Sequence, residues 1–217
     1  MNPNDALFAV GASGVAGAGL GGAVLLAKLG VPRTYVRDLV HVGTGIWVIS
    51  WPFWSAPVLP IAITAAALVL VLAGPRALRS ALTGGDERWS GIVIYVLSYC
   101  VLTILGFTDA LFPAAAGLLA LSLGDGIGGL VGRRFGRLAY RAPGAKKKTL
   151  EGSLTVAVMS SLGGAFASAI FGAHASLLLV VQAGIVAALV EAFAPRGTDN
   201  ALLPLSVWLF VRTASLT

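Results

Sequence analysis

The sequence is poor in cysteine and in charge, and each shortage excludes a class of protein. Cys100 is the only cysteine, so the chain forms no intrachain disulfide. Charged residues make up 11% of the sequence, against about 25% in ordinary soluble domains. No basic stretch precedes the first apolar run, so we expect no cleaved signal peptide. The shortage of charge leaves a polytopic membrane protein as the expected class.

Long apolar runs occupy most of the chain. Hydrophobic residues make up 57% of the 217 residues, and the mean hydropathy is +0.90. A helix that crosses a membrane needs about 20 mainly apolar residues. We predict seven such helices, at 5–27, 38–56, 57–74, 89–108, 110–131, 153–172 and 174–193. An eighth segment, 201–215, is short and contains Arg212, so it crosses obliquely or lies at the interface.

Little of the chain is left for a soluble domain. Residues 1–217 are therefore expected to form one all-α domain, a polytopic bundle of about seven or eight transmembrane helices. The net charge of +6 does not indicate nucleic acid binding, because the cations gather in alternate loops. With the N-terminus outside, every Lys and Arg except Arg212 lies on the cytoplasmic side, as the positive-inside rule requires. We predict an integral protein of a prokaryotic plasma membrane, in contact with lipids, and leave open whether it forms a homo-oligomer.

The two predicted sides of the membrane differ in composition. On the outer side, Trp47, Trp51 and Trp54 are expected to form an aromatic belt. Asp109 and His174 are assigned to outer turns without a chemical role. The inner loops are charged and interrupted by Gly and Pro, at about 28–37, 75–88, 132–150 and 194–200. Candidate functional residues are therefore sought on the inner side.

Arg37 and His41 are the first candidates. They are four residues apart, so they share one face of the predicted helix. This spacing places an arginine at the inner boundary and an imidazole about one turn deeper. Two interpretations stay open: an arginine that reaches the interface beside a structural histidine, or a polar pair that belongs to a site.

Asp125 lies within an apolar helix, eight residues before Arg133 and so roughly 12 Å into the membrane. A carboxylate at that depth costs at least about 2.5–3.5 kcal/mol, so it needs a partner or a water-filled cavity. Glycines around it would let the backbone approach a bound phosphate: Gly124, Gly126, Gly128, Gly129 and Gly132. The alternative is helix packing, with Asp125 paired to an arginine.

A second group of candidates lies where the sixth predicted helix begins. Thr149 can cap that helix, and the uncapped amides beside Lys148 suit a phosphate. The Glu151 carboxylate suits a magnesium ion. The alternative is an ordinary helix cap that follows a basic loop.

An acid–amide pair, Asp199-Asn200, lies in the last inner loop. On its own the pair is typical of a helix N-terminus. With Asp125 and Glu151 on the same side of the membrane, Asp199 becomes a candidate third carboxylate for a metal site. Glu191, one or two turns earlier, is a candidate to orient a ligand or to line the cavity.

Taken in order, these elements resemble the CTP-dependent polyprenol kinase family, which includes phytol, farnesol and dolichol kinases. The family's elements are Arg-Lys-x-x-His, Gly-Asp with spaced glycines, Lys-Ser/Thr-x-Glu-Gly-Ser/Thr and a late Asp-Asn. They correspond here to Arg37…His41, Gly124-Asp125…Gly132…Gly136, Lys148–Ser153 and Asp199-Asn200. The resemblance covers roughly residues 33–210. One departure is Asp38, which stands where the family commonly has lysine, so Arg33 or Arg37 is expected to supply the cation.

The resemblance implies transfer of the CTP γ-phosphate to an isoprenoid alcohol such as phytol, geranylgeraniol or farnesol. It implies Mg²⁺ held by Asp125, Asp199 and Asn200, with Glu151 as a further ligand or as the base. His41 would orient the acceptor hydroxyl or act as the base instead. Catalysis would then consist of positioning and charge stabilisation. The implied phosphate-binding residues are Arg37, Arg133, Arg134, Lys148, Thr149, Gly152 and Ser153, together with the five glycines named above.

Three alternatives stay open. They are a CTP-dependent lipid cytidylyltransferase, a diacylglycerol kinase, and a small ion-coupled transporter that uses Asp125 and Glu191. The long Asp- and Arg-rich signature of cytidylyltransferases does not occur in this sequence. The charges of a transporter should lie near the midplane, whereas the charges here are predicted to gather at one face, which favours an enzyme.

Overall fold

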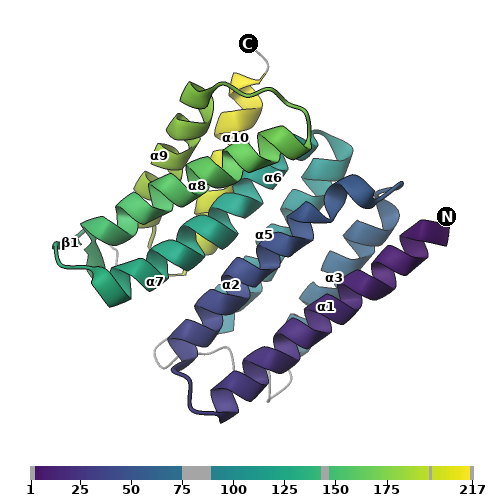
Figure 1. Cartoon of the computed structure of the whole chain (residues 1–217), viewed down its shortest axis with the longest axis horizontal. Helices are drawn as coiled ribbons and strands as arrows, with labels where there is room; N and C mark the ends of the chain where they lie inside the picture. The colour runs from purple at the N-terminus through teal and green to yellow at the C-terminus, as the bar shows by residue number, and fades with distance from the viewer. Residues whose placement is uncertain (1–2, 75–88, 143–146, 196, 216–217) are drawn as a thin grey trace.

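The computed structural model describes residues 3–74, 89–142, 147–195 and 197–215 (Figure 1). Five of the cations predicted on the cytoplasmic side lie outside these ranges: Arg76, Arg79, Arg88, Lys146 and Arg196. The described elements are helices except for one short antiparallel hairpin, β1–β2, in which Tyr140 pairs with Lys148.

The elements follow the order of the predicted apolar segments. They are α1 (Pro3–Lys28), α2 (Arg33–Ile49), the short 3-10 turn η1 (Trp51–Phe53), α3 (Val58–Ala73), α5 (Trp89–Thr108), α6 (Leu111–Leu119), the π-helical segment η2 (Ala120–Asp125), α7 (Gly126–Phe135), β1 (Ala139–Arg141), β2 (Lys147–Thr149), α8 (Leu150–Ile170), α9 (Leu177–Phe193) and α10 (Asp199–Ala214).

The structure supports a helical membrane protein, with fewer long spans among the described residues than the seven or eight predicted. Four helices are long and apolar enough to cross a membrane: Asp5–Lys28, Trp89–Thr108, Leu111–Phe135 and Leu150–Ile170. Val58–Ala73 and Leu177–Phe193 are apolar but shorter. The second predicted segment, 38–56, was placed too late in the chain: its helix already begins at Arg33 and ends at Ile49, before Pro52, whose ring cannot continue the hydrogen-bonding pattern.

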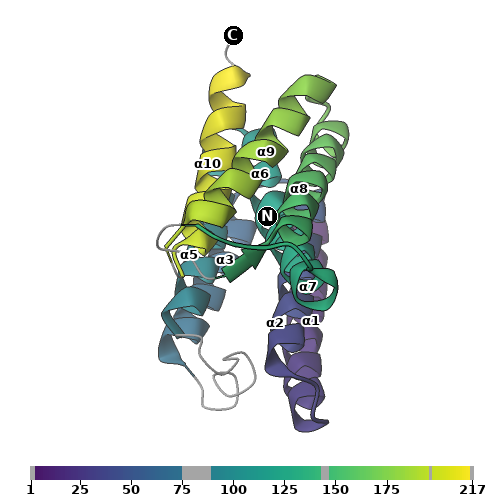
Figure 2. The same cartoon turned by 90° about the vertical axis from the view of Figure 1, so that its left-hand side faces the viewer.

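The continuous rod α6–η2–α7 forms the centre of the molecule. Its residues 112–122 are all buried, and Leu118, Leu119 and Leu121 are completely enclosed. Around the rod pack α2, α5, α8 and α10, and α9 lies beside α8 and α10 (Figures 1 and 2). By contrast, α1 lies at the periphery, against α2 and α3. The rod therefore carries Asp125 into the interior of the bundle.

Three glycines spaced four residues apart bring the rod into close contact with α8. A Cβ at Gly124 would lie 2.2 Å from Ser160 Oγ, and one at Gly128 would lie 2.4 Å from Val156 Cγ2. At Gly132 the nearest atom would be Thr149 Oγ1, at 3.0 Å. Close helix packing is therefore sufficient to explain glycine at these three positions. Phosphate binding by their backbone stays a prediction.

The predicted aromatic belt is wrong for two of its three tryptophans. Trp51 and Trp54 are 1% and 8% exposed, so they are part of the core and do not face lipid. Trp51 packs against Phe107, with ring centroids 5.4 Å apart, and against the backbone of Gly106. The short turn after α2 folds these side chains inward.

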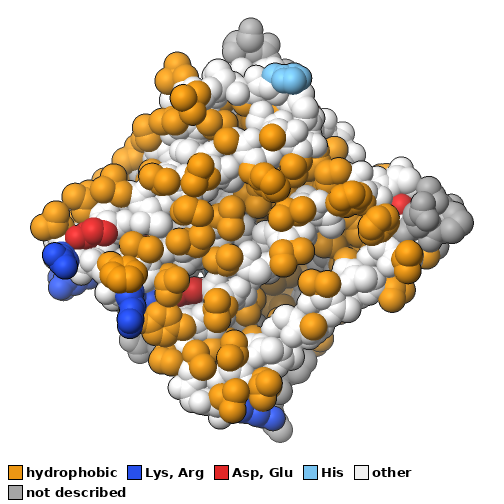
Figure 3. Space-filling model, in the orientation of Figure 1, with side chains coloured by type: hydrophobic (Ala, Val, Ile, Leu, Met, Phe, Trp, Pro, Cys, Tyr) orange, Lys and Arg blue, Asp and Glu red, His pale blue; other side chains and the backbone are white. Residues whose placement is uncertain are grey.

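The two ends of the bundle differ in charge. One end, called the basic end below, holds the last residue of α1, the first turn of α2, the end of α7 and the hairpin, with Lys28, Arg33, Arg37, Arg133 and Lys148. In Figure 3 the cations of the visible face gather along the lower-left edge, and apolar side chains cover most of the remainder. The opposite end holds the α5–α6 turn and the end of α10, about 30 Å away along α8.

Candidate active site

Asp125 is delivered to the interior by a change in helix type. The helix that starts at Leu111 opens into the wider π form over Ala120–Asp125 and returns to α-helix at Gly126. Such turns are rare and occur frequently at functional sites. This segment was not predicted, because no local sequence pattern distinguishes a π-helical turn within an apolar helix. The Asp125 side chain is 20% exposed, so it remains accessible to a ligand.

The structure brings His41 to Asp125. The Nε2 atom of His41 lies 3.9 Å from Asp125 Oδ2, and its Nδ1 atom lies 3.1 Å from the carbonyl oxygen of Arg37. A carbonyl oxygen only accepts hydrogen bonds, so the Nδ1 atom carries the proton. Nε2 is then the nitrogen with a free electron pair, and it faces Asp125.

A buried hydrogen-bond network holds His41 in this position. Its ring packs on Tyr95, with ring centroids 4.1 Å apart. The Thr44 hydroxyl donates to the His41 carbonyl oxygen at 2.6 Å, so it accepts hydrogen bonds from the hydroxyls of Tyr95 and Tyr99. None of these three residues was singled out from the sequence, because Tyr95 and Tyr99 lie on α5, which reads as an ordinary apolar helix, and Thr44 lies in the apolar part of α2.

Lys148 is paired with Glu191, which lies 43 positions later, near the end of α9. Burial lowers the pKa of Lys148, but the Glu191 carboxylate and the charges of Asp125 and Asp199 more than offset it, so the pKa lies above its ordinary value. Lys148 is therefore a permanent cation at physiological pH. Glu191, predicted to line the cavity or orient a ligand, contacts this cation.

Asp199 and Asn200 are the first two residues of α10, and Asp199 lies near Lys148 and Asp125. The Asn200 side chain donates to the Gly91 carbonyl oxygen at 2.8 Å and also reaches His41. Burial and the nearby Asp125 carboxylate raise the pKa of Asp199. Two acids that repel each other in a partly buried place indicate a position where a cation would be favourable. His41, Asp125, Lys148, Glu191, Asp199 and Asn200 are called the polar cluster below.

The donor set fits a magnesium ion that is bound together with phosphate. Among the residues that the structure describes, no three His, Cys, Asp or Glu side chains form a metal site by themselves. Mg²⁺ in phosphoryl-transfer sites usually takes one or two carboxylates and completes its shell with phosphate and water. Asp125 and Asp199 could supply these carboxylates, with the Asn200 amide beside them.

Glu151 was predicted as a further metal ligand beside Asp125 and Asp199, but its carboxylate bonds the hairpin backbone instead. Its Oε1 atom accepts hydrogen bonds from the backbone N–H of Arg137 at 2.9 Å and of Leu138 at 3.2 Å. The N–H of Leu150 donates back to the Leu138 carbonyl oxygen at 2.9 Å. These bonds fasten the hairpin, and therefore Lys148, to the start of α8.

The start of α8 confirms the predicted cap. The Thr149 hydroxyl accepts a hydrogen bond from the Gly152 N–H at 3.3 Å, as an N-cap residue does. The Ser153 hydroxyl bonds to the Tyr140 hydroxyl at 2.6 Å. Thr149 therefore caps α8 and Ser153 ties α8 to strand β1, and their contact with phosphate stays a prediction.

The predicted phosphate-binding arginines lie in two places. Arg37 and Arg133 both bind Asp38, from α2 and from the end of α7. Arg134 lines an open cavity of about 500 Å³ together with Arg137 and Glu151. The basic end thus offers cations on both sides of the last turn of α7.

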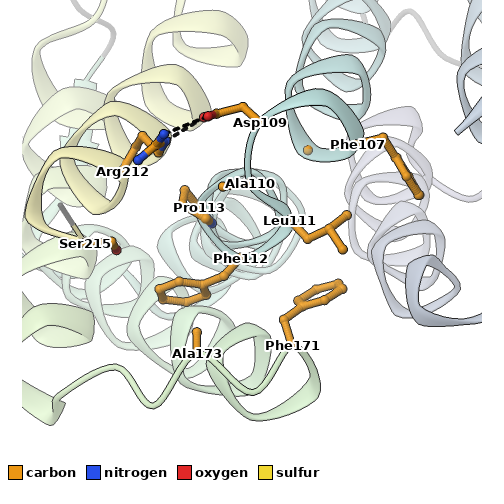
Figure 4. A pocket seen from close by; sticks show the side chains of 11 residues that line it. Phe107, Asp109, Ala110, Leu111, Phe112, Pro113, Phe171, Ala173, Arg212 and Ser215 are labelled. Carbon is orange, nitrogen blue, oxygen red and sulfur yellow. Dashed lines mark hydrogen bonds and ion pairs between the residues drawn. The ribbon is translucent and has the colours of Figure 1, made fainter.

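A second cavity, of about 610 Å³, lies at the opposite end of the bundle (Figure 4). Phe107, Phe112 and Phe171 line it, and the ion pair between Arg212 and Asp109 lies at its edge. Since the polar cluster is at the other end of α8, this cavity is not part of the candidate active site.

Comparison with known proteins agrees with the sequence resemblance. The chain is 35% identical over 209 residues to a phytol kinase from Synechocystis sp., covering 89% of this chain and 87% of that protein. No protein-family model and no solved structure matches the chain. Identity at this level over nearly the whole of both chains indicates common ancestry. The chain therefore belongs to the polyprenol kinase family to which phytol kinases belong.

Proposed function

We propose that this protein transfers the γ-phosphate of CTP to the hydroxyl of an isoprenoid alcohol such as phytol, geranylgeraniol or farnesol. One observation carries the proposal. His41 Nε2 and the Asp125 carboxylate face each other at 3.9 Å at the basic end, in a chain related to a phytol kinase. A base, a carboxylate and nearby cations are the parts that phosphoryl transfer to an alcohol uses.

In this proposal His41 is the general base. Its Nδ1 atom is held by the Arg37 carbonyl oxygen, so Nε2 accepts the proton of the alcohol. The alcohol oxygen bonds to the γ-phosphorus as the bond from that phosphorus to the β,γ-bridging oxygen breaks and CDP leaves. Asp125, which faces His41, is the proposed magnesium ligand beside the reacting hydroxyl. The products are CDP and the isoprenoid phosphate, with the proton on His41.

The cations of the basic end neutralise the phosphates. Lys148 is held beside the acids by Glu191, and Arg133 and Arg134 lie at the end of α7. Mg²⁺ bound by Asp125 and Asp199 would add charge neutralisation at the transferred group. Glu151 contributes indirectly, because it holds the hairpin that carries Lys148.

The membrane position follows from the two kinds of substrate. The isoprenoid tail stays in lipid while its hydroxyl reaches the polar cluster, and CTP arrives from the cytoplasm at the basic end. We propose that the N-terminus is outside and that the membrane is a prokaryotic plasma membrane. The shorter apolar helices α3 and α9, with α2 and α10, complete a bundle of about seven or eight transmembrane segments.

The test uses purified full-length protein with Mg²⁺ and CTP labelled at either the α- or the γ-phosphate. The acceptors are farnesol, geranylgeraniol, phytol, a long polyprenol and diacylglycerol. We expect label in an isoprenoid lipid from γ-labelled CTP and none from α-labelled CTP. Label from the α-phosphate would identify a cytidylyltransferase, and transfer to diacylglycerol alone would identify a diacylglycerol kinase. Loss of transfer in Asp125→Asn ties the activity to this site.

A further inference from the structure

Asp38 is a buried carboxylate between two arginines. It lies on α2 and is 4% exposed. Arg37 donates to it at 3.3 Å, and Arg133 from α7 forms an ion pair with it. A charge buried this deeply must be paired, and the Asp38 carboxylate offsets the repulsion between the two guanidiniums. Asp38 therefore holds two cations side by side across the boundary between α2 and α7.

Gly126 and Gly129 leave room for the close contacts of α7 with α2 and with the Arg133 side chain. A Cβ at Gly129 would lie 3.3 Å from Nη1 and 3.4 Å from Nη2 of Arg133, so the guanidinium folds back over Gly129. At Gly126 a Cβ would lie 3.2 Å from the Cβ of His41, so α7 approaches α2 closely there. The close approach sets the distance across which Asp38 reaches Arg133.

The two arginines border the polar cluster. Arg37 lies one turn before His41, and its charge acts on both His41 and Asp199. Arg37 and Arg133 also act on each other. Together with Asp38 the group keeps one net positive charge. A guanidinium has five N–H donors, so one that binds Asp38 through Nη2 can bind phosphate oxygens as well.

We infer that Asp38 positions Arg37 and Arg133 as a pair that binds the phosphates of the nucleotide. The inference rests on the proposed function, because a nucleoside triphosphate is the ligand that would require these cations beside Asp125. Without the carboxylate the guanidiniums repel each other and separate. The loss then falls on nucleotide binding, while His41 and Asp125, which are held by other contacts, keep their geometry.

The experiment measures kinetics of full-length Asp38→Asn with Mg²⁺ and CTP. Asparagine keeps the size of the side chain and removes its charge. We expect KM for CTP to rise about tenfold or more, with kcat within about threefold of wild type. Asp38→Glu should recover most of the affinity. The matched control is Asp109→Asn, which breaks the Asp–Arg pair at the opposite end and should leave KM for CTP unchanged. An unchanged KM for CTP in folded Asp38→Asn overturns the inference.

A second variant keeps every charge. Gly129→Val puts a branched side chain against the Arg133 guanidinium, whose Nη1 would lie 3.3 Å from the new Cβ, so the guanidinium is expected to shift and KM for CTP to rise as in Asp38→Asn. If Asp38→Asn does not fold, a normal KM in Gly129→Val overturns the inference in its place. Calorimetric titration with CTP and Mg²⁺, without alcohol, separates the two proposals. A wild type that binds CTP more tightly than the variants but phosphorylates no alcohol would contradict the proposed function and support the role of Asp38.

Discussion

Both ends of the bundle carry an Asp–Arg pair, in different surroundings. At the opposite end Arg212 donates to Asp109 through Nε and Nη2 at 2.6 and 2.7 Å, and both side chains are partly exposed. At the basic end Asp38 is buried and shares two arginines. Water screens an exposed pair, whereas a buried carboxylate depends on its partners. An Asp–Arg ion pair is therefore a partly exposed contact between two helices at one end, and at the other end it holds two arginines next to each other.

The two ends also differ in what surrounds their ion pairs. The Asp109–Arg212 pair lies beside a cavity lined by phenylalanines, whereas the Asp38 pair lies beside a histidine, a lysine and several acids. Perturbed ionisable groups that converge from several helices indicate a functional site better than the size of a cavity does. The comparison predicts large effects on activity at the basic end and small ones at the opposite end.

The largest effect is expected from Asp125→Asn. It removes the carboxylate that faces His41 and the proposed metal ligand, so kcat should fall at least about 10³-fold. The melting temperature should change little, because the side chain is partly exposed and one of the mutually repelling acids is removed. Turnover and thermal unfolding in detergent measure the two effects. Full activity in a folded variant would contradict the assignment.

His41→Gln should reduce kcat by about 10²–10³-fold, the range expected for loss of a general base. Glutamine can still donate to the Arg37 carbonyl oxygen, and the Thr44 hydroxyl still bonds the backbone carbonyl oxygen of residue 41, so the local structure should stay intact. The comparison variant is Thr44→Val, which removes the hydroxyl that bonds the His41 backbone carbonyl oxygen and should lower kcat by about tenfold or less. Equal losses in the two variants would indicate that His41 is structural.

Lys148→Met should leave Glu191 buried without its cation, at a cost of about 3–5 kcal/mol in unfolding free energy. The double variant with Glu191→Gln should recover most of this loss. Because the folded-state pKa of Lys148 is raised, the stabilisation is complete below the unfolded value of about 10.4 and is lost as pH rises through the folded value. Thermal unfolding from pH 7 to 11 should show this decline in wild type and not in the double variant.

Glu151→Gln separates a metal ligand from a hairpin contact. The amide oxygen can still accept from the backbone of 137–138, so kcat and the Mg²⁺ dependence should stay within about threefold of wild type. Glu151→Ala removes the acceptor, loosens the hairpin and should lower activity further. A Mg²⁺ requirement raised about tenfold or more in Glu151→Gln would instead show that this carboxylate binds the metal.

The smallest effect is expected from Asp109→Asn at the opposite end. Arg212 lowers the pKa of Asp109 through its hydrogen bonds, so the stabilisation is present above the unfolded pKa of about 3.9 and is lost as pH falls through the folded value. Activity at neutral pH should not change. Wild type should lose a small part of its thermal stability below pH 4, and the variant should lack that step.

Much of the fold could be predicted from the sequence, because the deciding pattern is local. Every predicted apolar segment contains a helix, and Thr149 caps α8 as its position indicated. The π-helical segment before Gly126 could not be predicted, because it depends on how the rod packs against its neighbours. The inward position of Trp51 likewise depends on Gly106 and Phe107, which lie on another helix.

The sequence by itself determined that the chain is a helical membrane protein and that its cations lie in alternate loops. It also gave the candidates for chemistry, which stay predictions: His41, Asp125, Lys148, Glu151, Asp199 and Asn200. Hydropathy and short motifs are read within a few turns of helix, so they need no knowledge of contacts. Only the tertiary structure decided the partners: Lys148 with Glu191, Glu151 with the hairpin backbone, and Asp38 with Arg133 across 95 positions. Buried charges take whichever partner the packing of distant helices brings near, and that choice leaves no local pattern in the sequence.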